Sequence, residues 1–245
     1  MTLFISDLHL GSERPAIVRL FLDFLATRAR RADALYILGD LFEFWIGDEM
    51  AQLPPVAPIV AGLRALTDAG VHVRVMHGNR DFLLGAGFER ATGCRILAEP
   101  ARVRFDGEEV LLMHGDTLCS DDIEYQRFRK MVRNPEFVRD FLAKSVEERA
   151  AIAQNLRETS QAAIAGKKPE IMDVNENAVR DTMRSQGVRH IVHGHTHRPA
   201  QHVFDLDGAP ARRTVLGDWY EQGSVLEFAD GMWRLESLPV GEILT

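Results

Sequence analysis

The stretch Met76-His77-Gly78-Asn79-Arg80-Asp81-Phe82 decides the fold expected for this chain. An apolar run, Val71 to Met76, leads into it and gives way abruptly to glycine and polar residues. We expect a buried strand that ends in a turn at the edge of a sheet, where α/β proteins bind their ligands. Asn79 can ligate a hard cation through its amide oxygen, and the planar fork of Arg80 can bind a phosphate. Taken alone, the heptapeptide is more often a polar loop, so its meaning depends on the rest of the chain.

The same pattern of apolar strand and polar cluster occurs twice before this stretch. Leu3 to Ile5 lead into Asp7 and His9, and Ala34 to Leu38 lead into Asp40. Helices are expected between these strands, one beginning at Pro15 and one over residues 54–69. The order βαβαβ predicts a parallel sheet that delivers all three clusters to one edge.

The second half of the chain has shorter strands joined by glycine turns. Asp-Gly pairs predict three hairpins, at residues 106–107, 207–208 and 230–231. Further strands are expected over residues 101–105, 109–113, 188–192, 201–206, 212–217 and 223–228. The strand at 109–113 ends in His114, and the strand at 188–192 leads to His195 and His197.

A helical block, roughly residues 121–186, separates these β regions. Ser145 and Glu148 form a capping box, Gly166 and Gly187 are stop signals, and Asp173 is a second start signal. The block is expected to be an insertion that covers the sheet edge, like a lid. We expect a single domain over residues 1–245.

Composition limits the partners of the protein. The formal net charge of -7 argues against nucleic acid as a partner. Two cysteines are too few for a disulfide framework and fit a reducing cytosol. The first residues do not resemble a secretion signal, and no apolar run approaches the roughly 20 residues needed to span a bilayer. Any membrane contact is therefore expected to be peripheral, and we expect a monomer.

The side chains at the predicted strand ends have the chemistry of a metal site. Carboxylate, imidazole and amide oxygens together suit Mn, Fe or Zn, and enough are present for two ions if one carboxylate bridges. A single Asp-x-His or His-x-His pair is usually a chance occurrence on a surface. Five clusters of such side chains at strand ends, however, favour a dinuclear site. The predicted metal ligands are Asp7, His9, Asp40, Asn79, His114, His195 and His197.

Five blocks in this order resemble the calcineurin-like metallophosphoesterases: Asp7-x-His9, Gly39-Asp40, Gly78-Asn79, His114-Gly115-Asp116 and Gly194-His195-x-His197. The resemblance implies a four-layer α/β/β/α sandwich with two ions at one edge. By position, Asp7, His9, Asp40 and His197 would hold one ion. Asp40, as the bridge, would hold the other together with Asn79, His114 and His195. Two Mn²⁺ ions are expected, although other divalent ions also suit these ligands.

Arg80 departs from the pattern of the family, which usually has a histidine after the asparagine to protonate the leaving group. Arginine stays protonated and cannot act as that acid, but it can offset charge on a leaving phosphate. This favours a pyrophosphate over an alkyl phosphodiester. Gly-Asn-Arg-Asp-Phe-Leu at residues 78–83 is similar to a bacterial subgroup that hydrolyses UDP-2,3-diacylglucosamine in lipid A synthesis. The resemblance implies attack at the uridine-side phosphorus and release of UMP.

The subgroup also implies positions that act on the substrate. Catalytic roles fall on Asn79, Arg80 and His195, and the substrate contacts map to these three residues together with Asp122, Ser160, Ile164 and Lys167. Such an enzyme would work at the cytoplasmic face of the bacterial inner membrane as a peripheral protein.

Two features of the insertion remain open to alternative interpretations. Its apolar residues would line an acyl pocket or form the insertion's own core: Ile123, Phe128, Met131, Val132, Phe137, Phe141 and Leu142. Its basic residues would meet anionic headgroups or form a solvated helix face: Arg127, Arg129, Lys130 and Arg133.

Two other functions compete with this hypothesis. One is a phosphodiesterase or phosphatase of the same fold that acts on cyclic nucleotides, dinucleotides or phosphoproteins, and Arg80 distinguishes this chain from it. The other is a binding scaffold without turnover, which should have lost metal ligands, whereas this chain retains all of them.

Overall fold

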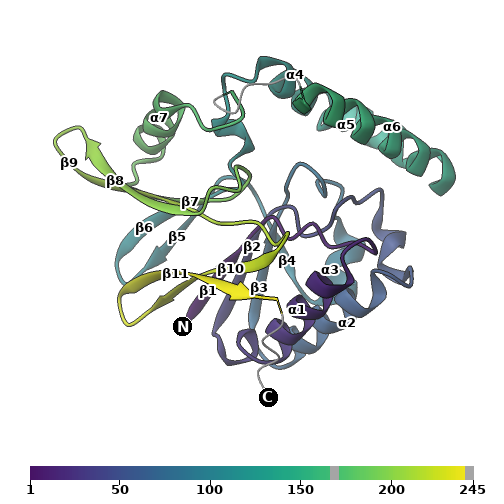
Figure 1. Ribbon diagram of the computed structural model, residues 1–245, viewed down its shortest axis with the longest axis horizontal. Helices are drawn as coiled ribbons and strands as arrows, with labels where there is room; N and C mark the ends of the chain where they lie inside the picture. The colour runs from purple at the N-terminus through teal and green to yellow at the C-terminus, as the bar shows by residue number, and fades with distance from the viewer. Residues whose placement is uncertain (166–170, 241–245) are drawn as a thin grey trace.

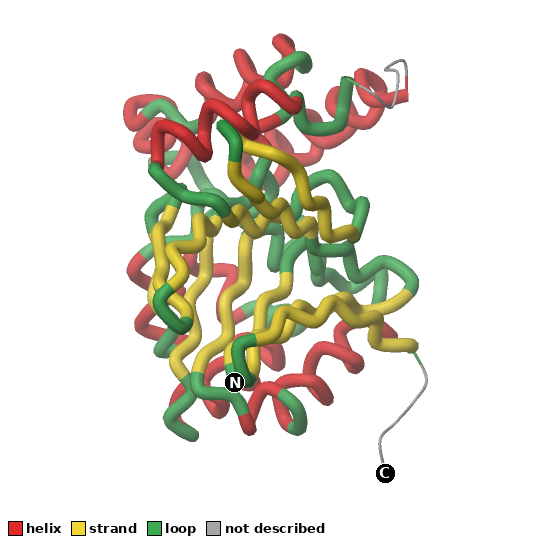
Figure 2. Tube along the Cα trace, turned by 90° about the vertical axis from the view of Figure 1, so that its left-hand side faces the viewer, coloured by secondary structure: helices red, strands yellow, loops and turns green. Residues whose placement is uncertain are grey.

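The computed structural model describes residues 1–165 and 171–240 as two β-sheets with helices on their outer faces and at one end (Figure 1). The first sheet has six strands in the order β11-β10-β1-β2-β3-β4, and the second has five in the order β5-β6-β7-β9-β8. Figure 2 shows the strands in the middle of the molecule with helices above and below them. The predicted α/β/β/α sandwich is therefore confirmed.

The first sheet is built on four parallel strands: β1 (Thr2–Ile5), β2 (Ala34–Leu38), β3 (His72–Met76) and β4 (Arg95–Leu97). The antiparallel strands β10 (Gln222–Ala229) and β11 (Met232–Pro239) extend it beyond β1. The register aligns Ile5 with Ile37 and Ile37 with Val75. The three strands thus end at the same level, and the polar clusters that follow them emerge side by side.

The second sheet has a parallel centre and antiparallel edges. Its strands are β5 (Ala101–Phe105), β6 (Glu108–Leu112), β7 (His190–His193), β9 (Ala209–Val215) and β8 (Ala200–Leu206). Strands β6, β7 and β9 run parallel, while β5 and β8 pair antiparallel at the edges. All three Asp-Gly pairs lie in the hairpins predicted for them, which join β5 to β6, β8 to β9 and β10 to β11.

Helices cover both outer faces of the sandwich. Three cover the first sheet: α1 (Pro15–Ala26), α2 (Ala57–Asp68) and α3 (Ala86–Thr92). The second sheet is covered by α7 (Glu176–Gln186), which buries Val179 and Met183. Strand β1 shows why the layers stack, because Leu3 and Ile5 join the core under the helices while Phe4 joins the core between the sheets. A strand buried on both faces needs a continuous apolar run, as observed here.

The lid consists of three helices: α4 (Ile123–Val132), α5 (Pro135–Leu142) and α6 (Val146–Ala165). They lie across the end of the sandwich where the parallel strands stop (Figure 1). The capping box is confirmed, since the Glu148 N–H donates to Ser145 Oγ at 3.2 Å and the Ser145 N–H donates to Glu148 Oε2 at 2.9 Å. The lid is shorter than the helical block of 121–186, because α7 packs on the second sheet instead.

Several short elements differ from the sequence-based expectations. Helix α3 and strand β4 have no counterpart among the predicted elements, and helix α2 begins at Ala57 rather than at residue 54. The N-cap of α7 is Asn175, whose side chain accepts from the N–H groups of Asn177 and Ala178, so the start signal assigned to Asp173 is wrong. Three short 3-10 helices are also present: Ala29–Arg31, Asp48–Gln52 and Asp116–Leu118.

Candidate functional site

The predicted metal ligands follow directly on five strand ends and meet at one edge of the sandwich. Asp7 and His9 follow β1, Asp40 follows β2, and Asn79 follows β3. His114 follows β6 of the second sheet, and His195 and His197 follow β7. The two sheets therefore supply the site from opposite sides, and the side chains converge between them.

One cluster consists of Asp7, His9 and His197, whose ligand atoms all lie within 4.8 Å of one another. His197 Nε2 is 3.4 Å from His9 Nε2 and 3.4 Å from Asp7 Oδ1. Asp7 Oδ1 is buried and has no hydrogen-bond partner among the described residues. An anionic oxygen buried in this way is expected to face a cation.

A second cluster consists of Asn79, His114 and His195. Asn79 Oδ1 lies 3.0 Å from His114 Nε2 and 3.0 Å from His195 Nδ1. Atoms about 2.1 Å from one ion lie roughly 3.0–3.4 Å apart in octahedral or tetrahedral coordination. The spacing in both clusters fits a divalent ion.

Asp40 lies between the two clusters. Its Oδ2 atom is 3.8 Å from His9 Nε2 and 3.9 Å from His114 Nε2, while its Oδ1 atom accepts from the backbone N–H of Arg80 at 2.8 Å. Asp7, Asp40 and His114 also form a group with ligand atoms within 4.8 Å. The donor set therefore fits two ions, and the position of Asp40 supports a bridging role.

The backbone of the cluster residues is strained. Asp7, His9, Asp40, His195 and His197 have φ values of 56°, 48°, 52°, 67° and 55°. The left-handed region is rare for residues other than glycine and costs of order 1–3 kcal/mol each where it persists. Such strain is typical of a functional site, and here it occurs at five of the seven predicted ligands.

Two glycines of the motif blocks allow the loops to approach closely. A Cβ atom at Gly78 would lie 2.0 Å from Asp40 Oδ1, and one at Gly194 would lie 2.2 Å from Asp7 Oδ2. Neither carboxylate could keep its place beside a larger residue. The glycines that precede Asn79 and His195 are therefore needed for packing.

Asp81 holds two of these loops together, a role that the sequence analysis missed. Its Oδ1 atom accepts from the Gly78 N–H at 2.8 Å, and its Oδ2 atom accepts from the Leu41 N–H at 2.8 Å. The turn after β3 is thus fixed to the turn after β2. The adjacent motif was visible in the sequence, but the partner at Leu41 was not.

Burial keeps two of the histidines neutral. It lowers the pKa of His9 and of His195 to about 3, so each ring offers a lone pair near neutral pH. Burial also raises the pKa of Asp40 to about 7, and the charges of Asp81 and Asp7 act in the same direction. A cation beside this carboxylate would favour its ionised form.

The other two histidines carry protons where a metal would bind. Burial opposes charge on His197, but the nearby carboxylates of Asp218 and Asp7 outweigh this effect and raise its pKa to about 10. Burial likewise opposes charge on His114, but Asp40 and further carboxylates raise its pKa to about 9. Both protons must leave when the imidazoles become ligands.

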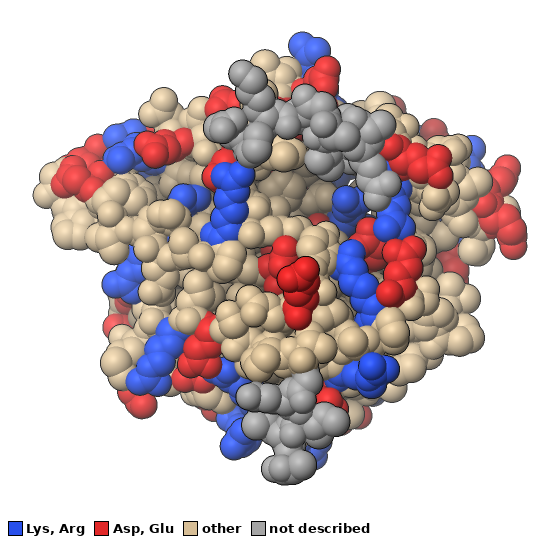
Figure 3. All heavy atoms as spheres, viewed as in Figure 1, with Lys and Arg blue, Asp and Glu red and all other residues tan. Residues whose placement is uncertain are grey.

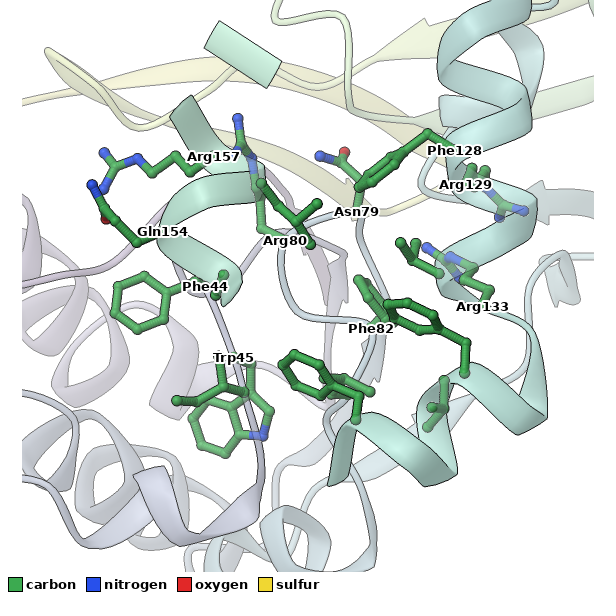
Figure 4. A pocket seen from close by; sticks show the side chains of 18 of the residues that line it. Phe44, Trp45, Asn79, Arg80, Phe82, Phe128, Arg129, Arg133, Gln154 and Arg157 are labelled. Atoms are coloured by element: carbon green, nitrogen blue, oxygen red, sulfur yellow. The ribbon is translucent and has the colours of Figure 1, made fainter. Parts of the chain in front are cut away.

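A mostly apolar pocket of about 420 Å³ opens beside the clusters, between the lid and the strand ends (Figure 4). Asn79 and Arg80 lie at its polar end, and lid residues Phe128, Val132, Phe137 and Phe141 line it as predicted. The other apolar lid residues do not line it but are exposed: Ile123 to 60%, Met131 to 50% and Leu142 to 41%. Four of the seven residues thus line a pocket, although Phe137 and Phe141 also pack against the core, and a role in holding acyl chains stays a prediction.

Arg80 joins the clusters to the pocket. Its backbone belongs to the clusters, because its N–H donates to Asp40 Oδ1 and its carbonyl accepts from the Trp45 N–H at 3.1 Å. Its side chain lines the pocket, and its Nε atom is buried without a hydrogen-bond partner among the described residues. A buried, unpaired guanidinium nitrogen beside a pocket is suited to an anionic ligand.

The remaining predicted substrate contacts lie on the lid or in parts of the chain that the structure does not describe. Asp122 is 9% exposed and caps α4, where its side chain accepts from the Tyr125 N–H at 3.1 Å. Ser160 and Ile164 belong to α6, but their side chains lie outside the described part of the structure, as does Lys167. Contacts of these four residues with a substrate remain predictions.

Buried polar contacts fix α4 to the strand ends. Tyr125 Oη donates to Asp116 Oδ2 at 2.7 Å, and Arg129 Nε donates to the same oxygen at 2.6 Å. Arg133 Nη2 donates to the Gly78 carbonyl at 2.8 Å. Spacing of four residues places these side chains on one face of α4, a signal that was present in the sequence.

These contacts also answer the question of the basic residues on the lid. Arg129 and Arg133 turn inward to the site, whereas Arg127 and Lys130 are exposed. Only the latter two are available to an anionic surface. On the face drawn in Figure 3, basic and acidic side chains are interspersed.

Comparison with known proteins places the chain in a family. A profile described as calcineurin-like phosphoesterase matches residues 1–199. A UDP-2,3-diacylglucosamine hydrolase of Pseudomonas aeruginosa is 51% identical over 238 residues, covering 97% of this chain and 99% of that protein. A protein of the same name from Nitrosococcus oceani is 49% identical, covering 92% of this chain and 90% of its own length. Among solved structures, an archaeal phosphodiesterase is similar with a TM-score of 0.47 at 12% identity, covering 97% and 99% of the two chains. The chain therefore belongs to the calcineurin-like phosphoesterase family.

Proposed function

We propose that the protein hydrolyses the pyrophosphate bond of UDP-2,3-diacylglucosamine in lipid A biosynthesis. Water attacks the uridine-side phosphorus, and the products are UMP and 2,3-diacylglucosamine 1-phosphate (lipid X). The name and near full-length identity of the relatives support this substrate. The observation that carries the proposal is the junction at Arg80, where a metal-type donor set meets an apolar pocket of about 420 Å³. A lipid-linked diphosphate requires both.

Two divalent ions, which we propose to be Mn²⁺, would occupy the clusters. Asp7, His9, Asp40 and His197 would hold one, and Asn79, His114 and His195 would hold the other together with Asp40. When bound, such a pair supplies Lewis-acid polarisation of phosphoryl oxygens and an acidified water. Buried neutral imidazoles such as His195 keep their lone pairs available for this purpose.

Arg80 would bind the diphosphate from the pocket side. Its guanidinium stays protonated and can donate two parallel hydrogen bonds to phosphoryl oxygens. It can offset the charge that develops on the leaving sugar phosphate, which needs little protonation. The backbone on either side of Asn79 is held, because the Arg80 N–H donates to Asp40 and the Gly78 N–H donates to Asp81. The side chains of Asn79 and Arg80 would therefore be oriented before substrate arrives.

The acyl chains would enter the apolar part of the pocket. Figure 4 shows Phe44 and Trp45 from the segment after β2 on one side of it, and Phe128 from the lid across from them. A cavity of this size lies within the range of small-molecule sites, roughly 300–1,000 Å³. Burial of chain methylenes would contribute about 0.8 kcal/mol each.

Exposed apolar residues on the lid support peripheral contact with the inner membrane at its cytoplasmic face. Ile123, Met131 and Leu142 are exposed, together with Arg127 and Lys130. Among the described residues, no helix has the length and apolar character needed to cross a bilayer. The protein is expected to act as a monomer, which light scattering at working concentration can check.

Product analysis tests the reaction. Purified protein with Mn²⁺ should release UMP from UDP-2,3-diacylglucosamine, and far less from unacylated UDP-N-acetylglucosamine. Equal rates on the two substrates would contradict the role of the apolar pocket. In ¹⁸O-labelled water the label should appear in UMP, and label in the sugar phosphate would exclude attack at the uridine-side phosphorus.

A further inference from the structure

We infer that Asp218 and Glu43 are positioning residues for His197 and His9, and that the site of these histidines binds its ion more tightly than the other. The inference rests on the dinuclear centre proposed above. We call the site of Asp7, His9 and His197 the first site, and the site of Asn79, His114 and His195 the second; Asp40 is shared.

Asp218 fixes the orientation of His197. Its Oδ2 atom lies 3.0 Å from His197 Nδ1, on the side of the ring opposite to Nε2, which faces Asp7 and His9. A carboxylate that accepts from Nδ1–H holds the proton there and leaves the lone pair on Nε2 for an ion. The partial negative charge that it transfers also makes the imidazole a stronger ligand.

The segment that carries Asp218 is itself held firmly. The next residue, Trp219, is fully buried, and its backbone N–H donates to the Asp7 carbonyl at 3.0 Å. The preceding Gly217 N–H donates to Ser224 Oγ at 3.0 Å. Asp218 is therefore anchored to β10 and to the loop of a predicted ligand, as a positioning residue requires.

Glu43 stands in the equivalent place behind His9. Its Oε2 atom faces His9 Nδ1 at 3.6 Å, and neither atom has a hydrogen-bond partner in the described parts of the chain. Arg157 of the lid holds the other oxygen of Glu43 at 3.3 Å, and Arg14 lies 3.8 Å from Oε2. The carboxylate is thus held close to the imidazole by contacts from two arginines.

The second site has a different outer environment. His114 Nδ1 lies 2.9 Å from the Leu38 carbonyl, a neutral acceptor. His195 turns Nδ1 toward Asn79 Oδ1, a predicted ligand of the same ion, at 3.0 Å. Asp116 acts on this site electrostatically, but its carboxylate accepts from Tyr125 and Arg129 rather than from a histidine. The ring nitrogens of His197 and His9 that point away from the ligand cluster thus face carboxylates, whereas that of His114 faces a backbone carbonyl.

This asymmetry predicts ordered loading. Outer-shell partners of metal-bound histidine are typically worth 10- to 100-fold in metal affinity. The first ion added to metal-free protein should therefore occupy the first site. The second site should fill only at higher concentrations of free ion.

Mn²⁺ titration of the metal-free full chain tests the inference, with free Mn²⁺ measured by electron paramagnetic resonance. Asp218→Asn keeps the shape of the side chain but lets an amide N–H face His197 Nδ1, which favours the wrong tautomer. We expect the affinity for the more tightly bound ion to fall about 10- to 100-fold. The affinity for the more weakly bound ion should change less than about 3-fold. Asp218→Glu should restore part of the loss.

Glu43→Gln is the second variant. It should also lower the affinity for the more tightly bound ion, and it leaves Asp218 in place. Glu221→Gln is the matched control, because it removes one charge from an exposed residue close to Asp218 in sequence. Thermal melting of metal-free samples should show a cooperative transition for the variants and the control, which confirms that they fold.

The outcomes separate the inference from the proposed function. Wild-type protein that fails to bind two ions overturns the dinuclear centre, and the inference with it. Wild type that binds two ions, with Asp218→Asn and Glu43→Gln indistinguishable from Glu221→Gln, overturns only the assigned positioning roles. An equal fall in affinity for both ions likewise overturns the assignment of these residues to the first site.

Discussion

Replacing Arg80 by alanine tests whether diphosphate binding can be lost while the proposed metal centre stays intact. The two backbone hydrogen bonds of residue 80, to Asp40 Oδ1 at 2.8 Å and from the Trp45 N–H at 3.1 Å, do not involve its side chain. The turn and both ions should therefore remain in Arg80→Ala. Only the guanidinium, which lines the pocket, is lost.

The expected loss of turnover follows from the hydrogen bonds that the guanidinium can make. One hydrogen bond with a charged partner is worth about 1.5–3 kcal/mol, so a two-pronged grip on the leaving phosphate is worth about 3–6 kcal/mol. At 1.36 kcal/mol per tenfold, this predicts a fall of about 10² to 10⁴ in kcat. Arg80→Lys keeps the charge but not the fork, so we expect a smaller loss, about 10- to 100-fold.

Stability should not fall in step with activity. Arg80 Nε is buried without a partner in the described structure, and such a group costs about 1–3 kcal/mol of folding free energy. Its removal should leave the melting temperature unchanged or raise it. Residues selected for activity often have this effect on stability.

UMP release under Mn²⁺ saturation, combined with metal analysis of the same samples, provides the assay. Arg139→Ala is the matched control, because Arg139 lies on the lid with 70% of its side chain exposed. A rise in KM with unchanged kcat would show that Arg80 binds substrate and transition state equally, which refutes the proposed role. Loss of metal from Arg80→Ala would refute the idea that only the backbone of Arg80, and not its side chain, supports the metal site.

Three further predictions follow from the geometry and the pKa shifts. In Gly194→Ala the new Cβ would meet Asp7 Oδ2 at 2.2 Å, so metal analysis should show loss of at least one ion, whereas Gly11→Ala, with its nearest contact at 3.6 Å, should keep both. Burial lowers the pKa of His190 to about 3, so only the unfolded chain takes up this proton as the pH falls below about 6.5. Wild-type stability should therefore fall by about 1.4 kcal/mol per pH unit between pH 6 and 4 through this residue, and His190→Gln should remove that contribution. Urea unfolding measures the slope, and an unchanged slope in the variant would contradict the prediction. Because the pKa values of His114 and His197 are raised to about 9 and 10, binding of Mn²⁺ at pH 7.5 should release about two protons, which calorimetry in buffers of different ionisation enthalpy detects; zero release would contradict the assigned ligands.

The sequence predicted the strands that lead into the site because each is an apolar run with an abrupt polar end. The predicted strand at 34–38 matches β2 in full, and the strand at 101–105 matches β5. The order of strands and helices then required a parallel sheet, which placed Asp7, Asp40 and Asn79 at one edge. Physical rules that act over a few residues were sufficient for this part.

Contacts between distant segments were not predictable from the same rules. Asp81 accepts from Leu41, forty residues away, and Asp116 accepts from Arg129 on the lid. Nothing in the local sequence of an aspartate identifies a remote partner. The left-handed backbone at His195 and His197 was equally hidden, since it arises from convergence of loops and not from residue preference.

Short elements escaped prediction for another reason. Strand β4 has three residues and helix α3 has seven, so neither is long enough to show a hydrophobic period. The lid raised a different problem, because the sequence indicated helices but not which of their faces turn inward. Ile123 and Phe128 are both apolar residues of α4, yet only Phe128 lines the pocket.

The polar contacts of the lid explain how an apolar pocket stays open. Apolar surfaces of this kind are driven to close on each other, at about 25 cal/mol per Å². Helix α4 is fixed by Asp116, while α6 is fixed from the other side by Arg149, which is 6% exposed and donates to the Ile46 carbonyl and to Glu49. To collapse the pocket, the helices would have to break these contacts and leave the buried groups of Asp116 and Arg149 without their partners, which is unfavourable. The charged residues of the lid thus preserve the space that acyl chains would require, and they hold it next to Arg80 and the predicted metal ligands.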